Sequence, residues 1–173
     1  MTERTSLGEP DAGPSPGPAD PSFAGAVYGS LLAASVVAGT SAAGPYARVE
    51  LVLLLLCTGL VFWAAHTYSA LVGELLPHRP LTWSGIARVC VHEWPIAQAA
   101  VAPALAVAVS PLFGLGLDGA AWLGLGVAVV QQVFWASAAV LRAGASRRAV
   151  VSAGSVNLAL GLLIVAAKVA IQH

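Results

Sequence analysis

The side chains best suited to chemistry lie in and just after an apolar run that ends near Leu71. His66 is inside this run, and an imidazole there could pass a proton or bind a metal near neutral pH. Five residues share one face of the expected helix because they recur at steps of four, three, three and four: Gly59, Trp63, His66, Ser69 and Gly73. An ionisable residue inside an apolar span is a functional candidate by default. The alternative is that His66 only hydrogen-bonds to a neighbouring helix, and the sequence leaves both interpretations open.

Four ionisable side chains follow His66 and could extend a proton or ligand path to the rim of the membrane: Glu74, His78, His92 and Glu93. Histidine and carboxylate ligands suit zinc, iron or manganese, so the metal-ligand candidates are His66, Glu74, His78 and His92. Pro77 and Pro80 argue against a continuous helix there, and neither H-E-x-x-H nor E-x-x-H occurs. We therefore predict no cofactor and leave metal binding open.

These residues must be positioned by membrane helices. The chain is 58% hydrophobic and 9% charged, with a mean hydropathy of +0.82, whereas soluble domains are about 25% charged. Each apolar stretch has about the 20 residues that a helix needs to cross the hydrocarbon core. The sequence predicts an all-α polytopic membrane bundle, 23–171, with five spans at 23–42, 49–71, 95–113, 119–141 and 149–171.

Two further segments have their own patterns. Residues 1–22 are rich in proline, glycine, serine and acids, which predicts a disordered tail. In 82–94, apolar residues recur at helical spacing opposite a polar face, which predicts an amphipathic helix in the membrane interface. Thr82 is its expected N-cap, and Pro95 is expected to break or bend it away from the third span. Pro103 is expected to kink that span.

Small and amide-bearing residues predict how the spans pack. Gly154, Asn157, Gly161 and Lys168 share one face of the fifth span, which should meet the bundle. Amides in the third, fourth and fifth spans are expected to join helices by hydrogen bonds, although they could also line a polar path: Gln98, Gln131, Gln132 and Asn157. Lys168 is near the end of its span, so we expect its amine to reach the headgroups.

The distribution of positive charge predicts the orientation of the spans. Six arginines fall on the side of the N-terminus: Arg4, Arg79, Arg88, Arg142, Arg147 and Arg148. The other side has Arg48 and Lys168. Because cytoplasmic connections retain lysine and arginine, the N-terminus is expected in the cytoplasm and the C-terminus outside. One lysine, Lys168, against seven arginines, together with much alanine, glycine and valine, indicates the coding bias of a GC-rich bacterium, and therefore a cytoplasmic (inner) membrane.

The function predicted from these features is broad. The net charge of zero argues against nucleic-acid binding, and no hydrolase, nucleotide-binding or haem-attachment motif occurs. We predict a non-catalytic structural or accessory membrane protein, whose partners are the lipid bilayer and a second copy or another membrane protein. The alternative is a small transporter or proton- or metal-coupled carrier centred on His66, and a membrane enzyme with a cytoplasmic metal site is third. The sequence favours the absence of catalysis without deciding it.

A local pattern adds one resemblance. The end of the second span reads F-W-x-x-H-x-Y followed by L-V-G-E, carried by Phe62, Trp63, His66, Tyr68, Leu71, Val72, Gly73 and Glu74. This pattern resembles small multi-pass integral membrane proteins of actinobacteria. The resemblance implies a membrane location and no particular activity.

Overall fold

The computed structural model describes residues 21–40, 46–75 and 82–172, and every element in them is a helix. The helices are α1 (Pro21–Gly39), α2 (Ala47–Ala70), α3 (Trp83–Gln98), α4 (Val101–Val109), α5 (Leu117–Arg142) and α6 (Arg147–Gln172). A π-helical turn, Leu71–Leu75, continues α2, and a 3-10 turn, Ser110–Phe113, continues α4. Residues 1–20 of the predicted tail lie outside the described part of the chain, and α1 begins at Pro21, two residues before the expected start.

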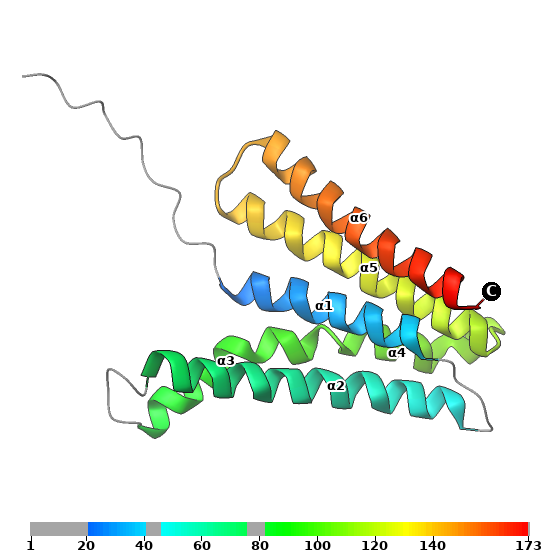
Figure 1. The fold of residues 1–173 in the computed structure, drawn as a ribbon, viewed down its shortest axis with the longest axis horizontal. Coiled ribbons are helices and arrows are strands. Elements are labelled where there is room, and N and C mark those ends of the chain that lie inside the picture. Colours follow the sequence, from blue (N-terminus) through cyan, green and yellow to red (C-terminus); the bar gives the residue numbers. More distant parts are fainter. Residues whose placement is uncertain (1–20, 41–45, 76–81, 173) are drawn as a thin grey trace, which may run out of the picture.

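The helices are long and apolar enough for a membrane protein. By length and composition four segments could cross a bilayer, namely Ala47–Gly73, Trp83–Phe113, Leu117–Arg142 and Arg147–Ala170, and Phe23–Gly39 is a shorter apolar helix. In Figure 1 the chain passes along the bundle in alternating directions, with α3 and α4 together making one pass. The described chain therefore starts at one end of the bundle and finishes at the other.

Helix α1 lies at the centre of the bundle because its side chains are small. It packs against α2, α3, α5 and α6, and Ala34 and Val37 are fully buried on it. Val37 joins Leu55, Val107 and Leu125 in a core contributed by α1, α2, α4 and α5. The small residues of α1 thus allow neighbouring backbones to approach closely.

Helix α3 begins where predicted but ends later. The Thr82 side chain accepts a hydrogen bond from the Gly85 amide at 3.3 Å, which confirms the N-cap. The predicted break at Pro95 is wrong, since α3 continues through Pro95 to Gln98. Pro95 leaves the carbonyl of Val91 without its helical donor, and Val91 is exposed at the surface.

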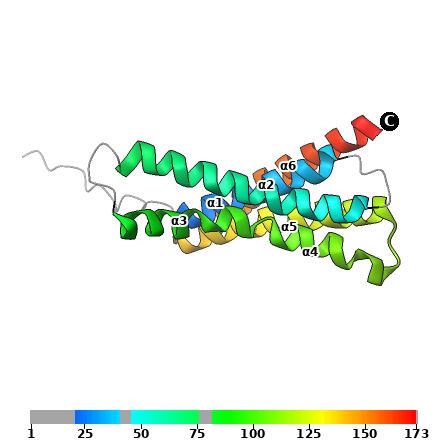
Figure 2. The ribbon, with the colours of Figure 1, turned by 90° about the horizontal axis from the view of Figure 1, so that it is seen from below.

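The interruption between α3 and α4 comes from Pro103. It falls at Ala99 and Ala100, and the Ala100 amide turns back to the Ala97 carbonyl at 3.2 Å. Pro103 has no amide proton for the carbonyl four residues earlier, which belongs to Ala99. The helix therefore changes direction one turn before the proline, where the sequence predicts a kink. Figure 2 shows α3 and α4 following one another along α2.

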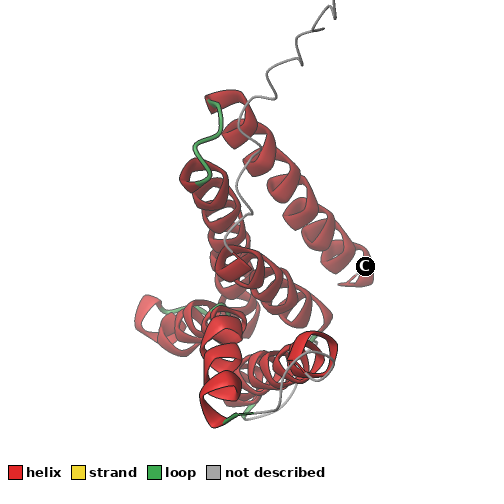
Figure 3. Ribbon diagram, turned by 90° about the vertical axis from the view of Figure 1, so that its left-hand side faces the viewer, coloured by secondary structure: helices red, strands yellow, loops and turns green. Residues whose placement is uncertain are grey.

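Helix α6 is the outermost helix. Figure 3 shows the helix that carries the C-terminus at the outside of the bundle, and α6 packs on α5 and α1. Gly161 and Lys168 are its only buried residues within the described side chains. Large apolar residues such as Val151, Val156 and Leu163 are exposed on it, as expected of a helix that contacts lipid.

Candidate functional site

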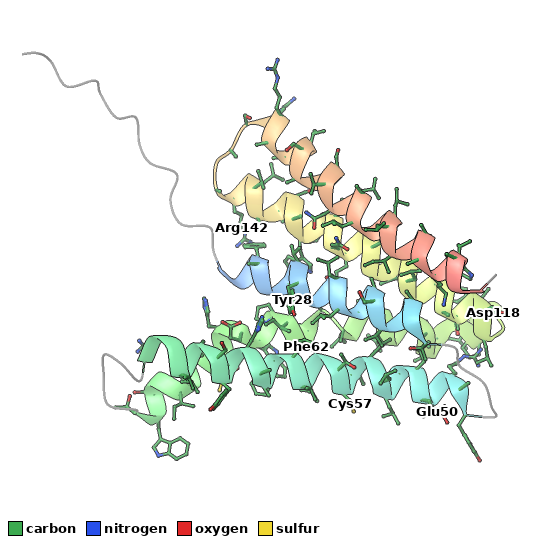
Figure 4. All side chains as sticks on the ribbon, viewed as in Figure 1. Tyr28, Glu50, Cys57, Phe62, Asp118 and Arg142 are labelled. Atoms are coloured by element: carbon green, nitrogen blue, oxygen red, sulfur yellow. The ribbon has the colours of Figure 1, made fainter. Side chains whose placement is uncertain are left out.

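The ring of His66 packs between α2 and α1. It stacks on Tyr28 of α1, with ring centroids 5.0 Å apart and planes inclined by 11°. Tyr28 in turn meets Phe62 edge-on at 6.2 Å, and Figure 4 shows these two side chains between the same two helices. His66 is half-buried, so its ring faces a neighbouring helix rather than open lipid.

The face of α2 that carries His66 is only partly covered. A Cβ added to Gly59 would lie 2.8 Å from the Cβ of Ala100, so α4 begins directly against this glycine. The indole of Trp63 donates to the Cys90 carbonyl at 2.9 Å and joins α2 to α3. Ser69 and Gly73 are exposed, and no atom would touch a Cβ at Gly73 within 4 Å. The five-residue face therefore contacts α3 and α4 only in its first half.

The other candidates for a proton or metal path lie on α3 or outside the described part of the chain. His92 is exposed and Glu93 half-buried on α3, while His78 and the side chain of Glu74 lie outside the described part of the chain. Within the described residues, no group of three or more histidine, cysteine, aspartate or glutamate side chains could hold a metal ion.

Gln131 and Gln132 join helices through backbone carbonyls, whereas Gln98 is exposed. Gln131 donates to the Ala99 carbonyl at 3.2 Å, which is the carbonyl that Pro103 leaves without a donor. Gln132 is fully buried and donates to the backbone and side-chain oxygens of Asn157 at 3.0 and 3.2 Å. The Asn157 amide donates to the Ala153 carbonyl in its own helix. These bonds connect α5 to the α3–α4 break on one side and to α6 on the other.

The stripe on α6 faces α5 and α1. A Cβ added to Gly161 would lie 2.6 Å from Val129 of α5, and one added to Gly154 would lie 3.1 Å from Ser137. Lys168 does not reach the headgroups, which corrects the expectation. It is 2% exposed, and its amine donates to the Val37 carbonyl at 3.2 Å, because α6 crosses α1 where α1 ends.

A cavity of about 290 Å³ between α1, α3 and α5 was not predicted from the sequence. Its polar lining comes from Gln98, Gln131 and Arg142, and its aromatic lining from Phe23 and Trp135. The Arg142 guanidinium lies 5.2 Å from the centre of the Phe23 ring, which is 5.7 Å from Trp135. Gln131, Trp135 and Arg142 are spaced by four and seven residues, so they share one helix face. This shared face is the sequence pattern from which the polar lining of the cavity could have been predicted.

The arrangement has two parts with different chemistry. The His66 contact is an aromatic junction between helices, whereas the cavity beside Arg142 offers a cation and an exposed amide to a ligand. The resemblance of residues 62–74 to membrane proteins of actinobacteria remains an expectation. Comparison with protein-family models, curated proteins and solved structures finds no match for this chain.

Proposed function

We propose that this chain is a non-catalytic structural or accessory component of a membrane. One observation carries the proposal: polar side chains inside the bundle are bound to backbone carbonyls of other helices. Trp63 binds Cys90, Gln131 binds Ala99, Gln132 binds Asn157 and Lys168 binds Val37. In hydrocarbon such bonds hold helices together at about 0.6–2 kcal/mol each. Side chains used in this way stabilise a scaffold.

The proposed topology has five spans and an interfacial segment. Phe23–Gly39 has 17 residues, or about 26 Å of helix, close to the thinner bilayers of about 27 Å. Trp83–Phe113 has 31 residues and would span about 46 Å if continuous, more than the core of about 30 Å. Its first turns therefore extend into the interface, where the 87% exposed Trp83 suits an aromatic belt.

We expect a reporter experiment to place the N-terminus in the cytoplasm and the C-terminus outside a bacterial inner membrane. The reason is the predicted excess of arginine on the N-terminal side. A green fluorescent protein fused after His173 should stay dark, and alkaline phosphatase fused there should be active. Phosphatase inserted after Pro80 should be inactive. A fluorescent C-terminal fusion, or active phosphatase in the 76–81 connection, would overturn this orientation.

A proton- or metal-coupled carrier centred on His66 is the second candidate. The observation that favours it is the position of the ring, half-buried within a helix interface, because ionisable groups at such depth often mark ion pathways. The same ring is also explained by its stack on Tyr28. The two functions are separated by changing His66 and Tyr28 in turn.

Under the accessory proposal, His66→Gln is expected to keep abundance and behaviour while losing only an aromatic contact of about 0.5–1.5 kcal/mol. Tyr28→Leu removes the same stack from the other helix and is the matched control. Both variants should therefore show similar small losses in thermal stability in detergent. Proton and metal flux are measured in proteoliposomes at equal protein content. A flux that His66→Gln abolishes and Tyr28→Leu retains would replace the accessory role by the carrier.

A further inference from the structure

The cavity beside Arg142 continues into an apolar groove on the outer surface of the bundle. The groove has a volume of about 480 Å³ and shares Gln98, Gln131 and Trp135 with the cavity. Beyond them its walls are Val101 and Leu105 of the third pass and Phe134 of α5. All three are exposed, with Phe134 at 62%. The cavity and the groove therefore form one continuous depression. Its polar end, the mouth, is lined by Gln98, Gln131 and Arg142, and its apolar part, the floor, by Val101, Leu105 and Phe134.

The length of this depression matches one leaflet. From Arg142 to Gln131 is eleven residues of α5, or about 16 Å at the rise of an α-helix. The opposite wall runs ten residues from Pro95 to Leu105, about 15 Å by the same rise. Half of the hydrocarbon core is also about 15 Å. A single acyl chain that starts at the mouth would end near the middle of the bilayer.

The mouth is suited to an anion. The guanidinium of Arg142 lies over the Phe23 ring, and a guanidinium binds phosphate oxygens through paired N–H donors. Figure 4 places Arg142 at one end of the bundle and Glu50 and Asp118 at the other. The exposed amide of Gln98 adds a second polar group to the mouth. Basic pockets between membrane helices are known to take anionic headgroups.

We propose that this groove binds one anionic glycerophospholipid, with its phosphate at Arg142 and one acyl chain between α4 and α5. A soluble anion would use the mouth and leave the apolar floor empty. A zwitterionic lipid would fill the floor but offer Arg142 a phosphate whose charge is offset by the lipid's own ammonium group. The proposal rests on the membrane placement of the helices and is independent of the accessory role.

The first experiment measures which lipid remains with the full-length protein after extraction in mild detergent. Native mass spectrometry should show one phosphatidylglycerol on the wild-type chain. Arg142→Gln removes the charge-assisted bonds, so we expect about tenfold less bound phosphatidylglycerol. Arg148→Gln is the matched control, because Arg148 is an exposed arginine on α6 outside the groove lining. Equal losses in both variants would show a general effect of charge and overturn the site.

The second experiment tests the floor separately from the mouth. Ala102 is an exposed residue that lines the groove, and Ala102→Phe should fill the groove while leaving Arg142 unchanged. We expect added phosphatidylglycerol to raise the melting temperature of the delipidated wild type but not of Ala102→Phe or Arg142→Gln. Phosphatidylcholine should give a much smaller rise. Circular dichroism confirms that the variants remain helical.

Three further outcomes would overturn the lipid site. Inorganic phosphate that stabilises the protein as well as phosphatidylglycerol would indicate a free-anion site. Equal stabilisation by phosphatidylcholine would indicate non-selective lipid contact. Unchanged binding by Ala102→Phe would place the acyl chain elsewhere. Recovery of the protein in the soluble fraction would contradict the membrane placement itself. A proton or metal flux that His66→Gln abolishes would contradict only the accessory role.

Discussion

Gly29→Ala is expected to lower the free energy of unfolding of the bundle by about 1–3 kcal/mol. A Cβ at this position would lie 2.6 Å from the Ile96 carbonyl oxygen and 2.8 Å from the Cβ of Ala99. Neither atom can rotate away, because one is backbone and the other is the first side-chain carbon. Helices α1 and α3 would have to separate. The change is measured as a shift in unfolding by denaturing detergent in mixed micelles.

The matched control is Gly126→Ala. Gly126 lies inside α5, as Gly29 lies inside α1, but no atom would touch its Cβ within 4 Å. Here alanine should cost nothing and could add up to about 1 kcal/mol through its higher helix propensity. If the two variants unfold alike, contact between α1 and α3 is not what makes glycine necessary at position 29.

Close contacts of this kind recur at the helix interfaces. A Cβ at Gly124 would lie 2.7 Å from Val107, and one at Gly161 would lie 2.6 Å from Val129. In a bilayer the hydrophobic effect does not drive helices together, so tight van der Waals packing and interhelical hydrogen bonds must do so. The central position of α1, which offers glycine, alanine and serine to its neighbours, follows from that requirement.

Much of the fold could be predicted because the membrane makes strong local demands. A span needs about 20 consecutive apolar residues, and the helices lie where such runs occur, including the short α1. The Thr82 cap also depends on neighbours within three residues. The face formed by Gly154 and Gly161 follows from helical periodicity alone, and it contacts α5 as the pattern indicates.

The remaining features depend on residues far apart in the chain. Gln131 binds a carbonyl 32 positions away, and Lys168 binds one 131 positions away. Hydropathy describes the composition of a segment and contains no information on which helix lies beside it. The cavity beside Arg142 needs α1, α3 and α5 in place before it exists.

The burial of Lys168 is the clearest of these long-range effects. Its amine donates to the carbonyl of Val37 in the last turn of α1. Carbonyls in the last turn lack donors within the helix, and the negative end of the helix dipole attracts a cation. The four-carbon stem meanwhile fills space between α6 and α1. The side chain therefore stabilises the bundle in two ways, through the hydrogen bond and through packing.

Two substitutions separate these contributions. Lys168→Ala removes both and is expected to lower the free energy of unfolding by about 2–4 kcal/mol. Lys168→Met keeps most of the stem and also removes the cost of burying a charge, so it should recover more than half of that loss. Val169→Ala, at a neighbouring residue that is 40% exposed, is the control and should change stability little. Unfolding in mixed micelles measures all three. A methionine variant as unstable as the alanine variant would show that the bond to Val37, rather than the packing of the stem, attaches α6 to α1.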